Sequence, residues 1–165
     1  MLAKEIKKLD QLFHDTLMDV YFAENKIVEV LPKMHEAAKS IQLKGAFEKH
    51  LAETKIHVTR LEEVFAIIGK EPEKKTCPAI LGITDEGAEI MEEYEGSPAL
   101  DAGLLAAAQA VEHYEMSRYG TLRTWALELG LTDAAGLLQT TLDEEQATDL
   151  ALTSIATSVV NQNAE

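Results

Sequence analysis

The stretch AAAQAVEHYEMSRYGTL at residues 106–122 has the spacing of an amphipathic helix that is interrupted at its centre. Apolar residues three or four positions apart run from Ala108 to Leu122, but Glu112 and Glu115 occupy two positions of this apolar face. Burying a carboxylate without a partner is costly. The stretch therefore predicts a long helix whose middle meets other polar or charged groups inside the protein.

Helix caps, glycines and prolines divide the chain into four long helical patterns. Ser40 can cap the start of the second pattern, and Gly69 and Gly130 suit left-handed C-terminal caps. The start of the third has Ser97 as N-cap, Pro98 at the first helical position and Asp101 in the first turn, where the helix dipole favours an acid. The patterns cover residues 4–38, 41–68, 98–128 and 132–160.

The connection over residues 70–97 is long, and a short helix at about 85–95, started by Thr84, is expected within it. No stretch alternates as a strand does. Two helical pairs with tight bends and one long crossover are typical of ferritin-like bundles. We predict an all-α, ferritin-like four-helix bundle with a short extra helix in the crossover, formed by a single domain over residues 1–165.

Ionisable residues interrupt the apolar faces of the other three helices as well. Counted from the bends at Ser40 and Gly130, the interruptions of facing helices lie within roughly one turn of each other. Six buried carboxylates at one height would be prohibitive without cations, so the pattern predicts a di-metal carboxylate centre. Carboxylates with one or two imidazoles favour iron, with manganese as the alternative. The expected ligands are Glu24, Glu53, His57, Glu112, Glu115, Glu145 and Asp149.

Several alternatives stay open. Six carboxylates exceed the charge of two divalent ions, so one acid is protonated, lies outside the ligand set or is matched by a trivalent ion, and Asp149 or Glu115 is the first to be demoted. His50 is a ligand, a partner of one or a residue near the bundle wall. Supporting contacts are expected from His113 and from Tyr119, which can hydrogen-bond a ligand carboxylate. Glu145 is preferred to its neighbour Glu144 by helical phase alone.

Length, charge and composition narrow the class of protein. The chain has 165 residues, with 15 Lys and Arg against 29 Asp and Glu, a formal charge of −14 that argues against nucleic-acid binding. No stretch without a charge is long enough to span a bilayer, and no signal peptide is read at the N-terminus. Cys77 is the only cysteine, which excludes an internal disulfide framework. We expect a cytoplasmic protein that does not bind membranes.

Three segments resemble the bacterial YciE/YciF stress-protein family: ETKIHVTRLEEVF at 53–65, the stretch at 106–122, and TLDEEQATDLALTSIA at 141–156. The resemblance implies a ferritin-like fold related to the rubrerythrins, a homodimer, an association with stress responses and a di-metal site. Its implied ligands are Glu24, Glu53, Glu112, Glu115 and Glu145. Two departures leave the nitrogen content of the site open. His57 follows Glu53 by four residues where three are usual, and Asp149 stands where related di-iron proteins carry histidine.

The leading hypothesis is a ferritin-like di-metal protein that handles peroxide, oxygen or iron during stress. Enzymatic turnover does not follow from the sequence. Because no rubredoxin-like cysteine module is present, a redox activity would need an external electron donor. The alternative is a non-enzymatic, acidic helical dimer that acts as a structural or interaction module.

Overall fold

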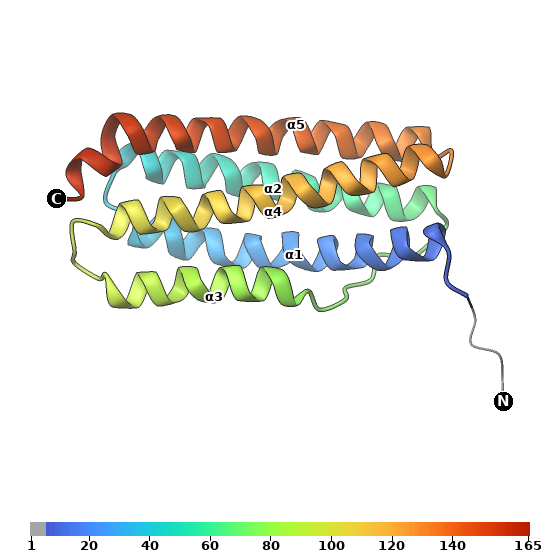
Figure 1. Cartoon of the computed structure of the whole chain (residues 1–165), viewed down its shortest axis with the longest axis horizontal. Coiled ribbons are helices and arrows are strands. Elements are labelled where there is room, and N and C mark those ends of the chain that lie inside the picture. The colour runs from blue at the N-terminus through green and yellow to red at the C-terminus, as the bar shows by residue number, and fades with distance from the viewer. Residues whose placement is uncertain (1–5) are drawn as a thin grey trace.

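The computed structural model describes residues 6–165 and consists of helices joined by short loops and one long connection (Figure 1). No strand occurs within these residues, which confirms the predicted all-α class. The first two positions of the predicted helix 4–38 lie outside the described residues. The α-helices are α1 (Leu9–Ala37), α2 (Ile41–Ile67), α3 (Pro78–Glu93), α4 (Leu100–Glu128) and α5 (Thr132–Ile155), followed by a π-helical turn (Ala156–Val160) and a 3₁₀ turn (Asn161–Asn163).

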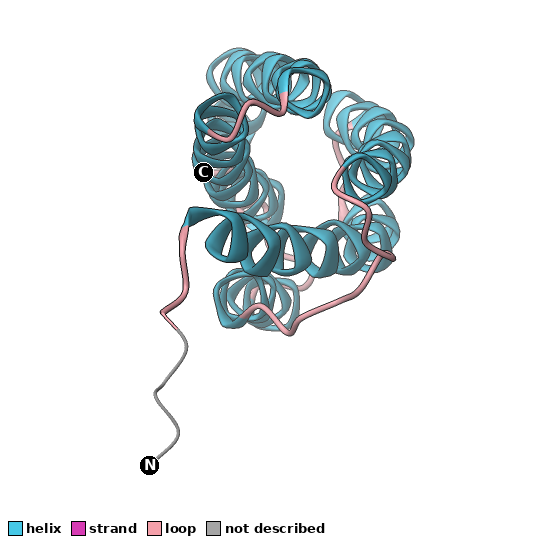
Figure 2. Cartoon of the chain, turned by 90° about the vertical axis from the view of Figure 1, so that its right-hand side faces the viewer, coloured by secondary structure: helices cyan, strands magenta, loops and turns pink. Residues whose placement is uncertain are grey.

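Four of the helices surround a common interior. α1 packs against α2 and α4, and α5 packs against the same two helices, so that the four form a ring with α3 outside it against α1 and α4 (Figure 2). α3 carries the chain back along the bundle, so α4 runs in the same direction as α2 (Figure 1). This arrangement confirms the predicted bundle with a long crossover and an extra helix. None of the helices described is long and apolar enough to cross a membrane.

Local capping explains why the tight bends form where the sequence predicts them. The Ser40 hydroxyl accepts a hydrogen bond from Leu43 N at 3.3 Å, and Gly69 and Gly130 adopt φ values of 67° and 74°. Asp101 lies in the first turn of α4 as expected. Its carboxylate also accepts hydrogen bonds from the backbone N–H groups of Lys39 (2.8 Å) and Ser40, which ties α4 to the bend between α1 and α2.

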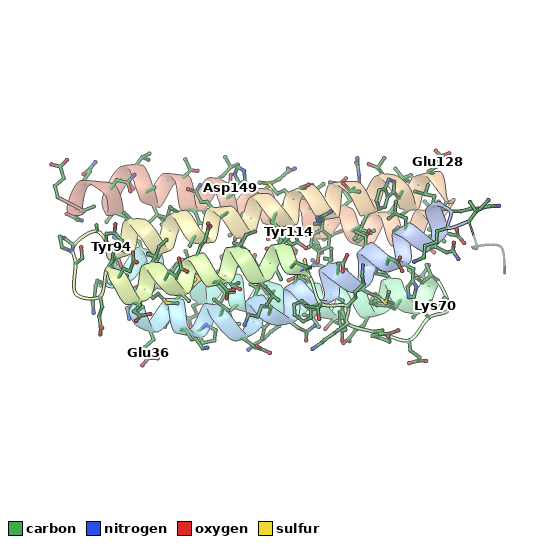
Figure 3. The ribbon with its side chains drawn as sticks, turned by 60° about the horizontal axis from the view of Figure 1, so that its bottom comes forward. Glu36, Lys70, Tyr94, Tyr114, Glu128 and Asp149 are labelled. Carbon is green, nitrogen blue, oxygen red and sulfur yellow. The ribbon has the colours of Figure 1, made fainter. Side chains whose placement is uncertain are left out.

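Three helix starts differ from the prediction. α1 begins at Leu9, and the described residues 6–8 before it are not helical. α3 begins at Pro78, seven positions before the expected start, because proline is preorganised for the first helical turn. The buried Cys77 precedes it, with Sγ 3.0 Å from the hydroxyl of Tyr114 on α4 (Tyr114 is labelled in Figure 3). Thr84 is therefore not a cap but lies inside α3, where its hydroxyl donates to the Ile80 carbonyl. α4 begins at Leu100, and Ser97 and Pro98 form the turn before it.

A polar layer divides the apolar core into two clusters. In α1, Phe13 and Leu17 belong to one cluster, Ile27 and Leu31 belong to the other, and Glu24 lies between them. α2, α4 and α5 show the same order, with buried ionisable residues between apolar segments. The predicted interruptions of the four apolar faces therefore meet at one level of the bundle.

Candidate metal centre

The polar layer consists of four glutamates and two histidines, one or two from each helix of the ring. Every one of these side chains belongs to a residue that is at most 2% exposed. α1 contributes one of them, α2 the two histidines, α4 two glutamates three residues apart, and α5 one. The six residues are Glu24, His50, His57, Glu112, Glu115 and Glu145.

Their nitrogen and oxygen atoms form two overlapping groups. In one group, single atoms of His50, Glu112, Glu115 and Glu145 all lie within 4.8 Å of one another. In the other, the same holds for Glu24, His57 and Glu145. Glu145 belongs to both groups, so the layer offers two adjacent positions for a cation with one carboxylate in common.

The contacts inside the layer are close but do not satisfy the side chains. His50 Nδ1 lies 3.1 Å from Glu112 Oε1, and His57 Nδ1 lies 2.9 Å from Glu145 Oε1 and 3.6 Å from Glu24 Oε1. The 2.9 Å contact between His57 Nδ1 and Glu145 Oε1 is not aligned as a hydrogen bond. His57 Nδ1 and both oxygens of Glu145 therefore have no hydrogen-bond partner. The same is true of His50 Nε2, both oxygens of Glu112 and Glu115, and Glu24 Oε2. Orphaned buried groups on this scale are rare in proteins and call for an explanation.

The pKa values of most of these glutamates are raised because burial removes water from their charges and few hydrogen-bond donors replace it. Burial raises the pKa of Glu24 to about 8, and burial together with the charge of Glu145 raises the pKa of Glu112 to about 11. Burial also raises the pKa of Glu115. Burial opposes the charged form of Glu145 too, but its contacts with His57 and His50 lower its pKa below the usual value. Without cations, this layer therefore retains protons that bound metal ions would displace.

The donor set fits two divalent cations. Four carboxylates and two divalent ions carry equal and opposite charge, whereas the six acids expected from the sequence left an excess. Carboxylate oxygens combined with imidazole nitrogens suit iron or manganese. Metal sites in helix bundles are built in the same way, from side chains on facing helices. These buried glutamates and histidines could therefore hold metal ions.

Tyr119 restrains one of the glutamates. It is buried at 1% exposure, and its hydroxyl donates a hydrogen bond to Glu24 Oε1, as the sequence suggested for a tyrosine near a carboxylate. Burial raises the pKa of Tyr119, and the negative charge of Glu24 adds to the shift, so the phenol keeps its proton. Glu24 Oε2 remains without a hydrogen-bond partner.

Besides Tyr119, three residues predicted for the site lie outside both groups: Glu53, Asp149 and His113. Glu53 has a side chain that is 21% exposed and forms an ion pair with Lys49 at 2.8 Å. The inward position between the two histidines belongs to Thr54, whose hydroxyl donates to the His50 carbonyl.

Asp149 and His113 pair with each other on the outer side of the bundle. His113 Nε2 lies 3.2 Å from Asp149 Oδ1, and the His113 side chain is 67% exposed. Asp149 is labelled on α5 in Figure 3. Gln109 donates a further hydrogen bond to the same Asp149 oxygen. The buried position of this turn of α5 is occupied by Thr148.

Glu144, weighed in the sequence only as an alternative to Glu145, contacts the layer from outside, and Arg60, which was not predicted, holds Glu144. Glu144 Oε2 lies 2.9 Å from His57 Nε2, and Arg60 donates hydrogen bonds to both oxygens of Glu144. The hydrogen bonds from Arg60 lower the pKa of Glu144. Arg60 follows His57 by three residues and therefore shares its side of α2, which was the available signal.

The fold and the buried layer define an all-α bundle of ferritin-like topology with a carboxylate and histidine interior. Residues 8–165 match the family model described as "Domain of unknown function (DUF892)", and the chain belongs to this family. Protein YciF of Escherichia coli (strain K12) is 40% identical over 161 residues, which are 97% of this chain and 97% of YciF. The resemblance noted in the sequence is thereby confirmed for YciF.

Two solved structures agree with this assignment. The crystal structure of the E. coli stress protein YciF superposes with a TM-score of 0.90 at 39% identity, covering 95% of this chain and 99% of that chain. YcfI from Rhodopseudomonas palustris, provisionally described as a structural protein, superposes with a TM-score of 0.90 at 41% identity, covering 94% and 99%. The chain is thus a YciF-type member of its family.

Proposed function

We propose that the buried layer binds two metal ions, iron in the first place and manganese as the alternative, and that the protein uses them to handle peroxide, oxygen or iron during stress. The observation that carries the proposal is the pair of overlapping groups that share Glu145. The stress association of YciF supports the physiological setting.

The buried acids favour bound cations on energetic grounds, whatever the chain resembles. Moving a charged carboxylate from water into the protein interior costs an effective several kcal/mol, unless its lone pairs are bound by a partner. Here both oxygens of Glu112, Glu115 and Glu145 lack such partners. Bound cations would supply them, whereas a purely structural core would be more stable with apolar residues at these positions.

The residues have separable roles. His50, Glu112 and Glu115 would hold one ion, Glu24 and His57 the other, and Glu145 both. Bound iron or manganese would supply the change of oxidation state that reduction of peroxide or oxygen, or oxidation of ferrous iron, requires. The apolar clusters on both sides of the layer exclude bulk water. One cysteine, Cys77, is too few for a rubredoxin-like iron module, so a reductant would come from another protein.

Metal analysis of protein purified without chelators tests the proposal. We expect two bound ions per chain and a higher melting temperature after Mn²⁺ or Fe²⁺ is added to stripped protein. Absence of bound iron and manganese, with a melting temperature that neither ion changes, would reject it. An oxygen-dependent near-ultraviolet band after Fe²⁺ addition would favour iron over manganese.

A second candidate function is a non-enzymatic structural or interaction module built from an acidic helical homodimer. The provisional description of YcfI as a structural protein favours it. On this account Glu112→Gln would leave dimerisation and any stress phenotype intact. Light scattering coupled to size exclusion measures the dimer, and loss of the phenotype in a correctly folded, dimeric variant would decide for the metal centre.

A further inference from the structure

The two histidines of the layer differ in what lies behind them. His50 directs both ring nitrogens at glutamates of the layer, with Nδ1 near Glu112 and Nε2 3.8 Å from Glu115 Oε2. His57 directs only Nδ1 inward, at Glu24 and Glu145. Its Nε2 points outward.

The outward nitrogen of His57 meets a carboxylate that does not belong to the layer. Glu144 Oε2 lies 2.9 Å from His57 Nε2, and the Glu144 side chain is 31% exposed. Glu144 is thus a bridge between the buried ring and the surface of the bundle.

Arg60 fixes this carboxylate from the other side. Its Nη2 donates to Glu144 Oε1 at 2.9 Å, its Nη1 donates to Glu144 Oε2, and Nη1 also donates to the fully buried Thr141 hydroxyl at 3.2 Å. A two-pronged guanidinium contact is the geometry that holds a carboxylate in one orientation. An ionised carboxylate only accepts hydrogen bonds. A neutral His57 ring beside it must therefore carry its proton on Nε2.

We infer that Glu144, held by Arg60, is a positioning residue that keeps the proton of His57 on Nε2 and so makes Nδ1 the atom that binds a metal ion. The inference rests on the proposed dinuclear site and names the atom through which one of its nitrogen ligands acts. Partners behind a ligating histidine fix its tautomer and orientation, and their loss commonly weakens metal binding by about 10–100-fold.

Glu144→Gln reverses this hydrogen-bond logic with little change of shape. A glutamine has one oxygen, whereas both Nη atoms of Arg60 need an acceptor. We expect the amide oxygen to face Arg60 and the amide NH₂ to face His57 Nε2, which favours the ring proton on Nδ1, where it blocks metal binding. Asp143→Asn is the matched control, because the neighbouring Asp143 is exposed and its carboxylate accepts a hydrogen bond from Gln139.

The experiment uses the full chain loaded with Cd²⁺ enriched in cadmium-113, with histidines labelled with nitrogen-15. In the wild type we expect direct cadmium–nitrogen coupling at His57 Nδ1, a proton on His57 Nε2, and a separate coupling at His50. Glu144→Gln should weaken Cd²⁺ binding at the His57 position by about 10–100-fold and remove the His57 coupling while that of His50 persists. Asp143→Asn should keep both couplings and the affinity.

Different failures have different meanings. Coupling at His57 Nε2, or a Glu144→Gln variant with unchanged affinity and coupling, would overturn the inference and leave the metal centre standing. No Cd²⁺ uptake by the wild type would overturn the proposed function and the inference with it. If Glu144→Gln fails to fold, Arg60→Met releases Glu144 instead, and an unchanged His57 coupling and affinity in that variant would count against the inference.

Discussion

Replacing Glu112 by glutamine distinguishes the stability of the metal-free protein from the stabilisation that bound metal provides. Burial and Glu145 raise the pKa of Glu112 to about 11, so in the metal-free protein this carboxyl is protonated at neutral pH. Glu112→Gln therefore exchanges one neutral group for another of nearly the same shape. We expect the free energy of unfolding of the metal-free protein to change by less than about 1 kcal/mol.

The effect on the metal-bound protein is expected to be much larger. Of the two ions, only the one held by Glu112 is directly affected; at a metal concentration about 100 times its dissociation constant, that ion alone stabilises the wild type by about 2.7 kcal/mol. For a chain of this size, each kcal/mol raises the melting temperature by about 2–4 °C, so the expected rise is about 5–11 °C. If loss of the carboxylate weakens binding about 100-fold, the gain at the same concentration falls to about 0.4 kcal/mol, a rise of about 1–2 °C.

Differential scanning fluorimetry with and without Mn²⁺ measures both quantities, and Glu53→Gln is the matched control. Glu53 lies on α2 outside both groups and pairs with Lys49, so its variant should retain the full metal-induced rise. An equal rise in Glu112→Gln and the wild type would refute the reasoning. So would a loss of the rise in Glu53→Gln, which would place the ligand set where the sequence pattern alone put it.

Three further predictions concern the surroundings of the layer. Tyr119→Phe removes the donor to the buried Glu24 Oε1 and should lower the free energy of unfolding by about 1–3 kcal/mol in urea titrations, and an unchanged midpoint would contradict this contact. The pKa of Glu24 is raised by burial to about 8 from an ordinary 4.5, so its protonated form stabilises the metal-free fold at low pH and this contribution is lost as pH rises through about 8. The metal-free protein should therefore lose stability between about pH 5 and about pH 9 in the same titrations, and a stability that rises over this range would be the contrary result. Asp101→Ala removes two acceptors at the bend between α1 and α2 and should cost about 1–3 kcal/mol, while the metal-induced rise in melting temperature stays as in the wild type.

Helical spacing was sufficient to predict the bundle because its signal extends over whole helices. The apolar faces, the caps at Ser40 and Gly130, and the long crossover each depend on many residues or on strong local chemistry. Phase also selected Glu145 over Glu144 for the interior, and the structure buries Glu145 completely. Signals of this kind survive an error at any single position.

Individual side chains at the edge of a helical face were harder to place. Residues three and four positions after His50 both lie near the inward side of α2. Thr54 takes the interior because its hydroxyl bonds to its own helix, whereas Glu53 finds Lys49 at the surface. Arg60 was missed because its spacing from His57 indicates only its side of α2, whereas its role depends on Glu144, 84 positions away.

Anomalous diffraction from crystals of the full chain grown with Mn²⁺ tests the dinuclear centre most directly. We predict two manganese peaks per chain, one in contact with His50 and Glu112, the other in contact with Glu24 and His57, and both in contact with Glu145. Crystals with manganese only at exposed acidic side chains, or with none, would contradict the account.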